Sequence, residues 1–339
     1  MTFLHRLLEL YSPSGQEQSV AEYLQSYMTT QGFRSWIDEV GNVIGEIGQG
    51  EEEILLLGHI DTVPGYIPVK IQGDEIFGRG AVDAKGALVV FITAALKIGV
   101  TAKKKITVIG AVDEENDSKG AYHILNKFKP QSVIIGEPSG HNGITLGYKG
   151  SFKIKCHCIK AQHHGAHDVS TSCEELVAFW NRIHSHCQSF NEGKRAFDRL
   201  DPSLQEFQSR SDGFCDTAEC GMGFRTPLDF SMPEFRTVIE ALRGSIEIEY
   251  VSEVPAFKAE KNNRLVRAFV QAIRTVGEVP KFKLKTGTSD MNIVGPFWNC
   301  PIVAYGPGDS SLDHTPEERL NLLEFSRSIQ VLQRVLEAL

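Results

Sequence analysis

The chain has 339 residues, more than one small hydrophobic core accommodates, so about two domains are expected. Its net charge of −8 and isoelectric point of about 5.8 argue against nucleic acid or an anionic membrane as a partner, because both require a basic face. No stretch approaches the ~20 apolar residues of a membrane span, and the N-terminus lacks a signal-peptide pattern. Seven irregularly spaced cysteines argue against a disulfide framework, so a cytoplasmic protein is expected.

Helical and strand-like patterns alternate through the first 148 residues. Apolar residues recur at helical spacing from Phe3 to Tyr11, and Ser14 with Glu17 predicts a capping box for a second helix. Further on, the pattern predicts strands over 43–47, 54–57, 106–112 and 133–135, and helices over 87–96 and 120–128. This alternation predicts an α/β domain with a mixed, mostly parallel sheet.

The pattern changes near Gly147. Residues 152–159 alternate like a half-buried strand, 191–212 are polar without a clear period, and 214–224 and 245–251 again suggest strands. Helices are predicted over 174–183 and 234–242. After Pro255 the earlier pattern returns, with a helix over 263–276, a strand over 301–305 and a last helix over 318–339. The simplest division is one domain of residues 1–148 and 252–339, with a small α+β domain, 149–251, inserted into it.

Acidic and imidazole side chains follow the strand-like runs directly. The segments are His59-Ile60-Asp61, Asp113-Glu114-Glu115 and Gly136-Glu137, with Asp83 in a glycine-rich loop and His314 near the C-terminus. Because ligand sites in open α/β sheets form at the carboxyl ends of strands, we expect these side chains to converge.

Each of these residues alone has an ordinary interpretation as a polar turn or packing residue. Together, two imidazoles and five carboxylates near strand ends are hard to bury without a counter-charge, and a pair of divalent cations would supply it; the carboxylates are Asp61, Asp83, Glu114, Glu115 and Glu137. Histidine and carboxylate ligands suit zinc, with cobalt or manganese possible. Asp83 is central in the order and is the candidate bridge, while Asp61 can accept the second N–H of the His59 imidazole.

In order, these segments resemble the motifs of the co-catalytic zinc aminoacylase and carboxypeptidase family, which includes acetylornithine deacetylase, succinyl-diaminopimelate desuccinylase and glutamate carboxypeptidase. The resemblance covers essentially the whole chain. The chain length and residues 285–292 look closest to the branch of [amino-group carrier protein]-lysine or -ornithine hydrolases and N-acetyl-lysine deacetylases. The resemblance to the family implies a phosphorylase/hydrolase-like catalytic domain, an inserted lid and dimerisation domain, and a homodimer.

The resemblance also implies a role for each residue of the candidate centre. Asp83 would bridge two Zn²⁺ ions, with His59 and Glu137 as ligands of one ion and Glu115 and His314 as ligands of the other. Glu114 would be the general base, and the Asp61 carboxylate would orient His59. The base would take a proton from water and pass it to the leaving amine.

The inserted domain contributes further candidates by the same resemblance. Residues 161–166 are similar to the family segment that places a histidine over the active site, often across a dimer interface. His163, His164 and His167 compete for this role, and His164 is chosen. Arg225 resembles the arginine that grips a substrate carboxylate, with an ordinary ion pair as the alternative. Thr288 and Ser289 are candidate substrate contacts. Cys156-His157-Cys158 does not match a zinc spacing and is expected to pack in a core.

The expected activity is metal-dependent hydrolysis of an amide that releases lysine or ornithine in amino-acid biosynthesis. The substrate would be a small N-acyl amino acid or a conjugate with an acidic amino-group carrier protein. A deacetylase, desuccinylase, dipeptidase or carboxypeptidase of the same family is the close alternative. A non-catalytic binding module would require a lost ligand or base, and none of the seven expected residues is missing.

Overall fold

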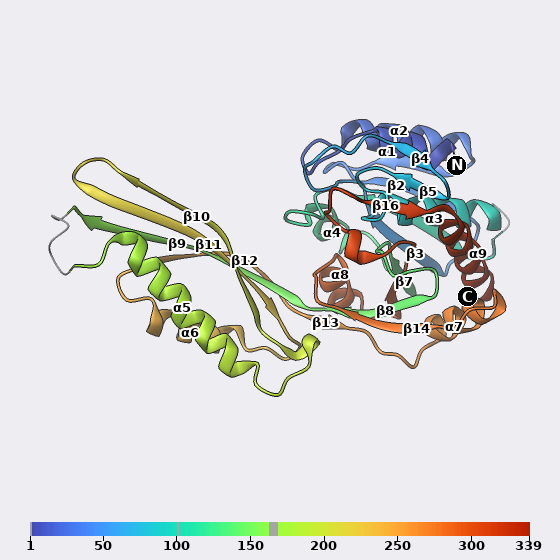
Figure 1. Cartoon of the computed structure of the whole chain (residues 1–339). Coiled ribbons are helices and arrows are strands. Elements are labelled where there is room, and N and C mark those ends of the chain that lie inside the picture. Colours follow the sequence, from blue (N-terminus) through green and yellow to red (C-terminus); the bar gives the residue numbers. More distant parts are fainter. Residues whose placement is uncertain (1, 100–101, 163–168) are drawn as a thin grey trace. The chain divides into compact units, whose positions relative to one another are not determined.

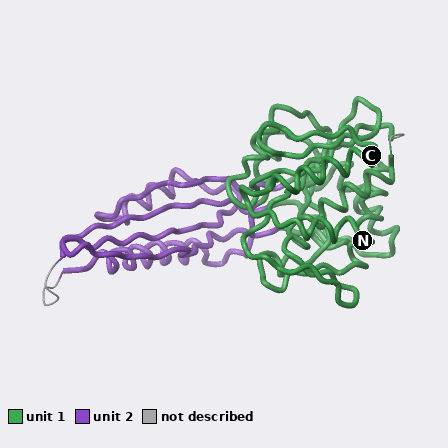
Figure 2. The backbone as a smooth tube through the Cα atoms, turned by 90° about the horizontal axis from the view of Figure 1, so that it is seen from above, with its two compact units in different colours: residues 1–147, 259–284, 289–339 green, residues 148–258, 285–288 purple. Residues whose placement is uncertain are grey.

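The computed structural model describes residues 2–99, 102–162 and 169–339, which form two compact units (Figures 1 and 2). Unit 1 consists of Met1–Gly147, Ala259–Leu284 and Ser289–Leu339, and unit 2 of Tyr148–Lys258 and Lys285–Thr288. The short segment Lys285–Thr288 therefore belongs to unit 2, although the residues before and after it belong to unit 1. None of the helices within the described ranges is long and apolar enough to cross a membrane.

Most strands of unit 1 belong to a nine-stranded mixed sheet in the order β1-β2-β6-β3-β7-β15-β8-β13, with β14 also paired to β8, and only the last strand of this sheet, β13, falls wholly within the residue range of unit 2. The strands are β1 Arg34–Ile37, β2 Val43–Ile47, β3 Glu53–His59, β6 Lys105–Ala111, β7 Ser132–Ile135, β8 Gly143–Tyr148, β13 Phe257–Lys258, β14 Lys281–Lys285 and β15 Ile302–Ala304. The predicted mixed α/β fold is confirmed. The four central strands β6, β3, β7 and β15 pair in parallel, and the pairs β1–β2, β2–β6 and β15–β8 are antiparallel.

Strand β3 is buried along its whole length, as its continuous apolar run predicts for a strand covered on both faces. The helices of unit 1 are α1 Thr2–Glu9, α2 Gln18–Thr30, α3 Lys85–Ile98, α4 Lys119–Ile124, α7 Arg264–Thr275, α8 Met291–Trp298 and α9 Leu322–Ala338. Helix α3 packs on β3 and β6 and against α9, while α2 packs on β1 and β2. One hydrophobic core runs through this unit.

Two local predictions for unit 1 are wrong. Glu17 is the N-cap residue of α2 and makes no side-chain cap, because the Ser14 hydroxyl donates to Asp61 instead and Glu17 accepts from the backbone of Gly15. The last helix begins at Leu322, where Asn321 caps it. Residues Arg319–Asn321 form β16, which pairs with β5 (Glu75–Phe77) in a small sheet completed by β4 (Lys70–Gln72).

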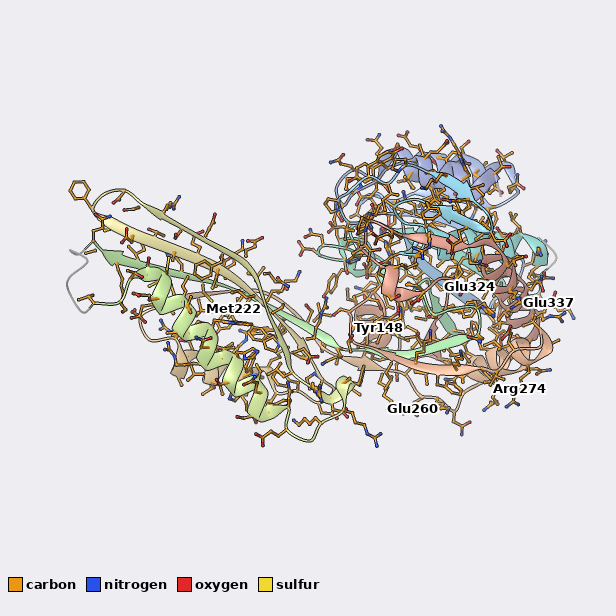
Figure 3. All side chains as sticks on the ribbon, in the orientation of Figure 1. Tyr148, Met222, Glu260, Arg274, Glu324 and Glu337 are labelled. Atoms are coloured by element: carbon orange, nitrogen blue, oxygen red, sulfur yellow. The ribbon has the colours of Figure 1, made fainter. Side chains whose placement is uncertain are left out.

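Unit 2 is an antiparallel sheet in the order β10-β11-β9-β12. Its elements are β9 Gly150–Ala161, β10 Asp201–Ser211, β11 Cys215–Thr226, β12 Glu247–Val254, helices α5 Ser172–Phe190 and α6 Met232–Leu242, and a 3₁₀ turn, η1 Ala196–Asp198. Buried side chains of β9 and β11, Met222 among them, form a second core with α5 and α6 (Figure 3). Cys156 and Cys158 are buried in this core, as expected. Strand β10 was not predicted, because almost all its residues are exposed and polar.

Candidate metal centre

The candidate residues of unit 1 meet at one edge of its sheet. His59 is the last residue of β3, Glu114 and Glu115 follow β6, and Glu137 follows β7. Because β6, β3 and β7 are neighbouring parallel strands, their carboxyl ends lie together. Asp83 comes from the loop before α3.

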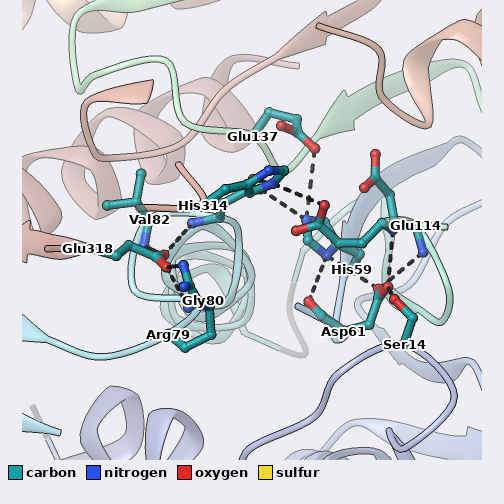
Figure 4. Close-up of polar contacts among 12 residues, drawn as sticks. Ser14, His59, Asp61, Arg79, Gly80, Val82, Glu114, Glu137, His314 and Glu318 are labelled. Atoms are coloured by element: carbon teal, nitrogen blue, oxygen red, sulfur yellow. Dashed lines mark hydrogen bonds and ion pairs between the residues drawn. The ribbon is translucent and has the colours of Figure 1, made fainter. Parts of the chain in front are cut away.

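His314 follows the short 3₁₀ turn η2, Ser310–Leu312. The distances among these side chains separate them into two groups that share Asp83 (Figure 4). His59 Nε2 lies 3.3 Å from Asp83 Oδ1 and 4.0 Å from Glu137 Oε1. His314 Nε2 lies 3.0 Å from both Asp83 Oδ2 and Glu115 Oε2. Each carboxylate oxygen of Asp83 therefore faces a different histidine.

The donor set fits a divalent metal ion. One ligand atom each from His59, Asp83 and Glu115 lie within 4.8 Å of one another. Glu115 Oε1 is buried and has no hydrogen-bond partner among the described residues. A buried carboxylate oxygen without a partner is costly, and a cation would satisfy it. Imidazole nitrogen with carboxylate oxygen is a ligand combination that zinc accepts.

Asp61 is fully buried and contacts both His59 and the Glu114–Glu115 turn. The Nδ1 atom of His59 lies 3.0 Å from the Asp61 carbonyl oxygen and 3.4 Å from its Oδ1, so Nε2 is directed at Asp83. The Asp61 carboxylate also accepts hydrogen bonds from the Ser14 hydroxyl at 2.7 Å and from the backbone N–H groups of Glu114 and Glu115, both at 3.1 Å. One side chain thus connects the His59 ring to the Glu114–Glu115 turn.

Burial and neighbouring charge shift the pKa values of these groups. Burial raises the pKa of Glu114 well above its usual range; His59 opposes the rise, and the charges of Glu137 and Asp290 add to it. Hydrogen bonds to Asp83 and Glu115 raise the pKa of His314 to about 10. Without cations, His314 is therefore a proton-holding group, and metal binding would release that proton because a ligating imidazole must be neutral.

Two residues of the centre adopt a left-handed backbone that residues other than glycine rarely take. Asp113, directly before Glu114, has φ 65°, and His314 has φ 62°. Such conformations cost free energy, and they concentrate at functional sites where the surrounding contacts impose them. Asp113 N–H donates to Glu17 Oε1 at 3.2 Å, which is one such contact.

The remaining predicted site residues lie elsewhere in the chain. Arg225 and Thr288 both belong to unit 2, where Arg225 Nη1 donates to Thr288 Oγ1 at 2.6 Å. Ser289 is buried in unit 1, and its hydroxyl accepts the backbone N–H of Met291 at 3.2 Å, at the start of α8. His163, His164 and His167 lie outside the described residues.

A second group of metal-ligand side chains, Asp38, Glu39 and His123, also occurs in unit 1. Here Lys127 Nζ lies 2.6 Å from both Glu39 Oε2 and His123 Nε2. The ammonium group already supplies a positive charge, so this group is an ion-pair network and not a second metal candidate.

Sequence analysis also missed a buried carboxylate, Glu318, that contacts the loop of Asp83. No local signal marks it, since the pattern around it suggested the start of a helix.

Comparison with known proteins places this centre in a family. The model of peptidase family M20/M25/M40 matches residues 55–338. The chain belongs to this family. It is therefore a metal-dependent hydrolase of amide bonds, and the predicted family and enzyme class are confirmed.

Two curated relatives match this M20-family chain along nearly its whole length. A "[LysW]-lysine hydrolase" of Deinococcus radiodurans is 40% identical, with 99% of this chain and 96% of the relative covered. A "Putative [LysW]-lysine/[LysW]-ornithine hydrolase" of Pyrococcus furiosus is 42% identical, with 98% and 95% covered. Among solved structures, the M20 family metallo-carboxypeptidase Sso-CP2 from Sulfolobus solfataricus shares the fold, with a TM-score of 0.80, 17% identity, and 99% and 98% coverage.

Proposed function

We propose that this protein is a di-zinc amidohydrolase that releases lysine or ornithine from an acyl or carrier-protein conjugate. The proposal of two metal ions rests on the two carboxylate oxygens of Asp83, because Oδ1 faces His59 and Oδ2 faces His314. Asp83 would bridge the ions, with His59 and Glu137 holding one and Glu115 and His314 the other. Cobalt or manganese is accepted by the same ligand types.

Bound there, a pair of divalent cations polarises a carbonyl group and makes water a stronger acid. The chain's own part is proton transfer. Glu114 is not among the proposed ligands, so its carboxylate can accept a proton and hold it between two steps. We propose that Glu114 takes the proton of the attacking water and gives it to the nitrogen of the leaving amine. Asp61 keeps the Glu114–Glu115 turn and the His59 ring in register.

The relatives support the substrate part of the proposal. Their names specify a LysW conjugate of lysine or ornithine, and the identity of 40–42% extends over nearly the full length of both chains. In unit 2, Arg225 and Thr288 are proposed to contact the substrate, Ser289 is proposed from unit 1, and His164 is the proposed additional catalytic residue. We further propose a cytoplasmic homodimer that assembles through unit 2; the seven free thiols are compatible with a reducing compartment.

A substrate panel with metal analysis tests the proposal. Protein loaded with Zn²⁺ or Co²⁺ is given N-acetyl-lysine, N-acetyl-ornithine, γ-glutamyl-lysine, N-succinyl-diaminopimelate and a dipeptide, and amine release is measured. We expect two ions per chain and the highest kcat/KM on a lysine or ornithine conjugate. Preferential cleavage of the dipeptide or the succinyl compound would reject the substrate class, and a single ion per chain would reject the di-metal part.

A further inference from the structure

The carboxylate of Glu318 is buried with a side chain that is 1% exposed, yet it lies outside the proposed ligand set. It accepts four hydrogen bonds, all from the loop that leads to Asp83 (Figure 4). Oε1 accepts the backbone N–H groups of Val82 at 2.9 Å and Asp83 at 3.1 Å. Oε2 accepts the backbone N–H of Gly80 at 3.1 Å and Arg79 Nη1 at 2.9 Å.

These bonds fix the direction in which Asp83 projects. A peptide unit is planar, so holding the N–H groups of Val82 and Asp83 fixes the two peptide planes on either side of the Val82 α-carbon, and the second of these planes leads directly into Asp83. Gly80 fits this loop because its φ is 86° and a β-carbon there would lie 3.0 Å from Thr62 Cγ2. The loop is therefore shaped around the carboxylate of Glu318.

Glu318 also connects Asp83 to the segment that carries His314. Glu318 follows His314 by four positions. Arg79 Nη1 donates to the Glu318 carboxylate and also, at 3.1 Å, to the carbonyl oxygen of Thr315. The backbone N–H of Gly78 donates to the carbonyl oxygen of Glu318 at 3.3 Å. Asp83 and His314, which meet at 3.0 Å, are thus joined a second time through Glu318 and Arg79.

We infer that Glu318 is a positioning residue that sets the spacing of Asp83 and His314, and thereby the affinity and geometry of the metal centre. This inference rests on the proposed function, because it takes Asp83 and His314 as ligands. Glu318 itself touches neither substrate nor metal in this role. Outer partners of this kind typically change metal affinity by about 10–100-fold when they are replaced.

Glu318→Gln is the sharpest variant, because it keeps the size of the side chain. A glutamine has one acceptor oxygen and one NH₂ group, so one of the two donor pairs would face another donor. Glu317→Gln is the matched control, since it makes the same change one residue away at an exposed side chain. Metal-free protein is titrated with Co²⁺ against a competing chelator, the visible spectrum is recorded, and the unfolding temperature is measured without metal.

We expect Glu318→Gln to bind Co²⁺ about 10–100-fold more weakly than the wild type, with an altered spectrum, and Glu317→Gln to match the wild type. A purely structural role would lower the metal-free unfolding temperature and leave Co²⁺ affinity and spectrum unchanged; that result would overturn the inference. If the wild type itself bound no pair of Co²⁺ ions, the proposed function would fail first, so the two failures are distinguishable.

Arg79→Lys provides the test if Glu318→Gln does not fold. Lysine keeps the charge but cannot reproduce the planar fork that reaches Glu318, Thr315 and the carbonyl oxygen of Gly65 together. We expect a smaller loss of Co²⁺ affinity than for Glu318→Gln, in a protein that unfolds cooperatively. Wild-type affinity and spectrum in this variant would overturn the link between Glu318 and His314.

Discussion

Among the described residues of unit 1, two groups of histidine and carboxylate side chains are spaced closely enough to hold a metal ion, and they differ in how their negative charge is compensated. In the first group, called the surface group and made of Asp38, Glu39 and His123, the Lys127 ammonium contacts Glu39 and His123. Asp38 accepts the backbone N–H groups of the adjoining turn. In the group around Asp83, the two histidines face the carboxylates, and Glu115 Oε1 is buried without a hydrogen-bond partner among the described residues. The same residue types therefore form an ion-pair network in one group and a candidate metal site in the other.

The difference teaches that ligand-type residues in proximity do not define a metal site. What distinguishes the two groups is whether the protein supplies its own cation and satisfies each oxygen. The surface group is compensated internally, and a metal ion would have to displace the Lys127 ammonium. The group around Asp83 requires a positive charge from outside, because several carboxylates are desolvated together.

The largest expected effect follows from removing the proposed bridge. Asp83→Asn removes one negative charge that would be shared between two ions, so we expect metal content to fall below two per chain and activity to fall on the order of 100-fold or more, exceeding the loss typical of an outer partner. Metal content is measured after gel filtration, and amine release is measured on the same sample. Glu39→Gln, the equivalent change in the surface group, should retain both. Equal metal loss in the two variants would contradict the distinction between the groups.

The next effect separates metal binding from proton transfer within the same centre. Glu114→Gln keeps the side-chain size but removes the group that accepts a proton, so kcat should fall by about 10²–10⁴-fold. Metal content and the visible spectrum of the Co²⁺ form should stay at wild-type values, because Glu114 is not a proposed ligand. A variant with lost metal would make Glu114 a ligand, and a variant with full turnover would assign the base to another residue.

How far these residues could be predicted from sequence depends on whether the signal is local. His59, Glu115 and Glu137 each follow an apolar strand, and adjacent parallel strands bring their ends together, so their convergence was predictable. Asp83 and His314 stand in loops whose paths no periodicity specifies; their place in the order of segments suggested that they join the centre, and the resemblance to a family assigned their roles.

The errors at Ser14 and Glu318 share one physical cause, which is a partner distant in the sequence. Ser14 has the spacing of a helix cap, but its hydroxyl binds Asp61, 47 residues away. Strand β10 is a different case: its partner β11 is the next strand in the chain, but its exposed polar residues lack the apolar alternation that marks a strand. Glu318 precedes a helical pattern, yet Arg319–Asn321 pair with β5 and its carboxylate binds residues 79–83, more than 230 positions earlier. Local propensity contains no record of such partners.

The smallest expected effect concerns acid stability of the surface group. The hydrogen bond from Lys127, then a backbone N–H and His123, lowers the pKa of Glu39 from 4.5 to about 2. A carboxyl group whose pKa is lower in the folded state stabilises the fold fully above about pH 4.5, and this contribution is lost as the pH falls towards 2. The pair is exposed and screened by solvent, so the contribution is small.

Glu39→Gln should therefore unfold at a slightly lower temperature than the wild type at pH 6, and the difference should shrink as the pH falls from 4.5 towards 3. Glu51→Gln, at an exposed glutamate without a side-chain partner among the described residues, should match the wild type at both ends of this range. Co²⁺ binding at pH 7 should be unchanged in both variants, since Lys127 already compensates the surface group. A difference that grows on acidification would reverse the sign of the Glu39 shift. A loss of Co²⁺ affinity in Glu39→Gln would show that this group binds metal despite its lysine, and would remove internal compensation as the feature that separates the two groups.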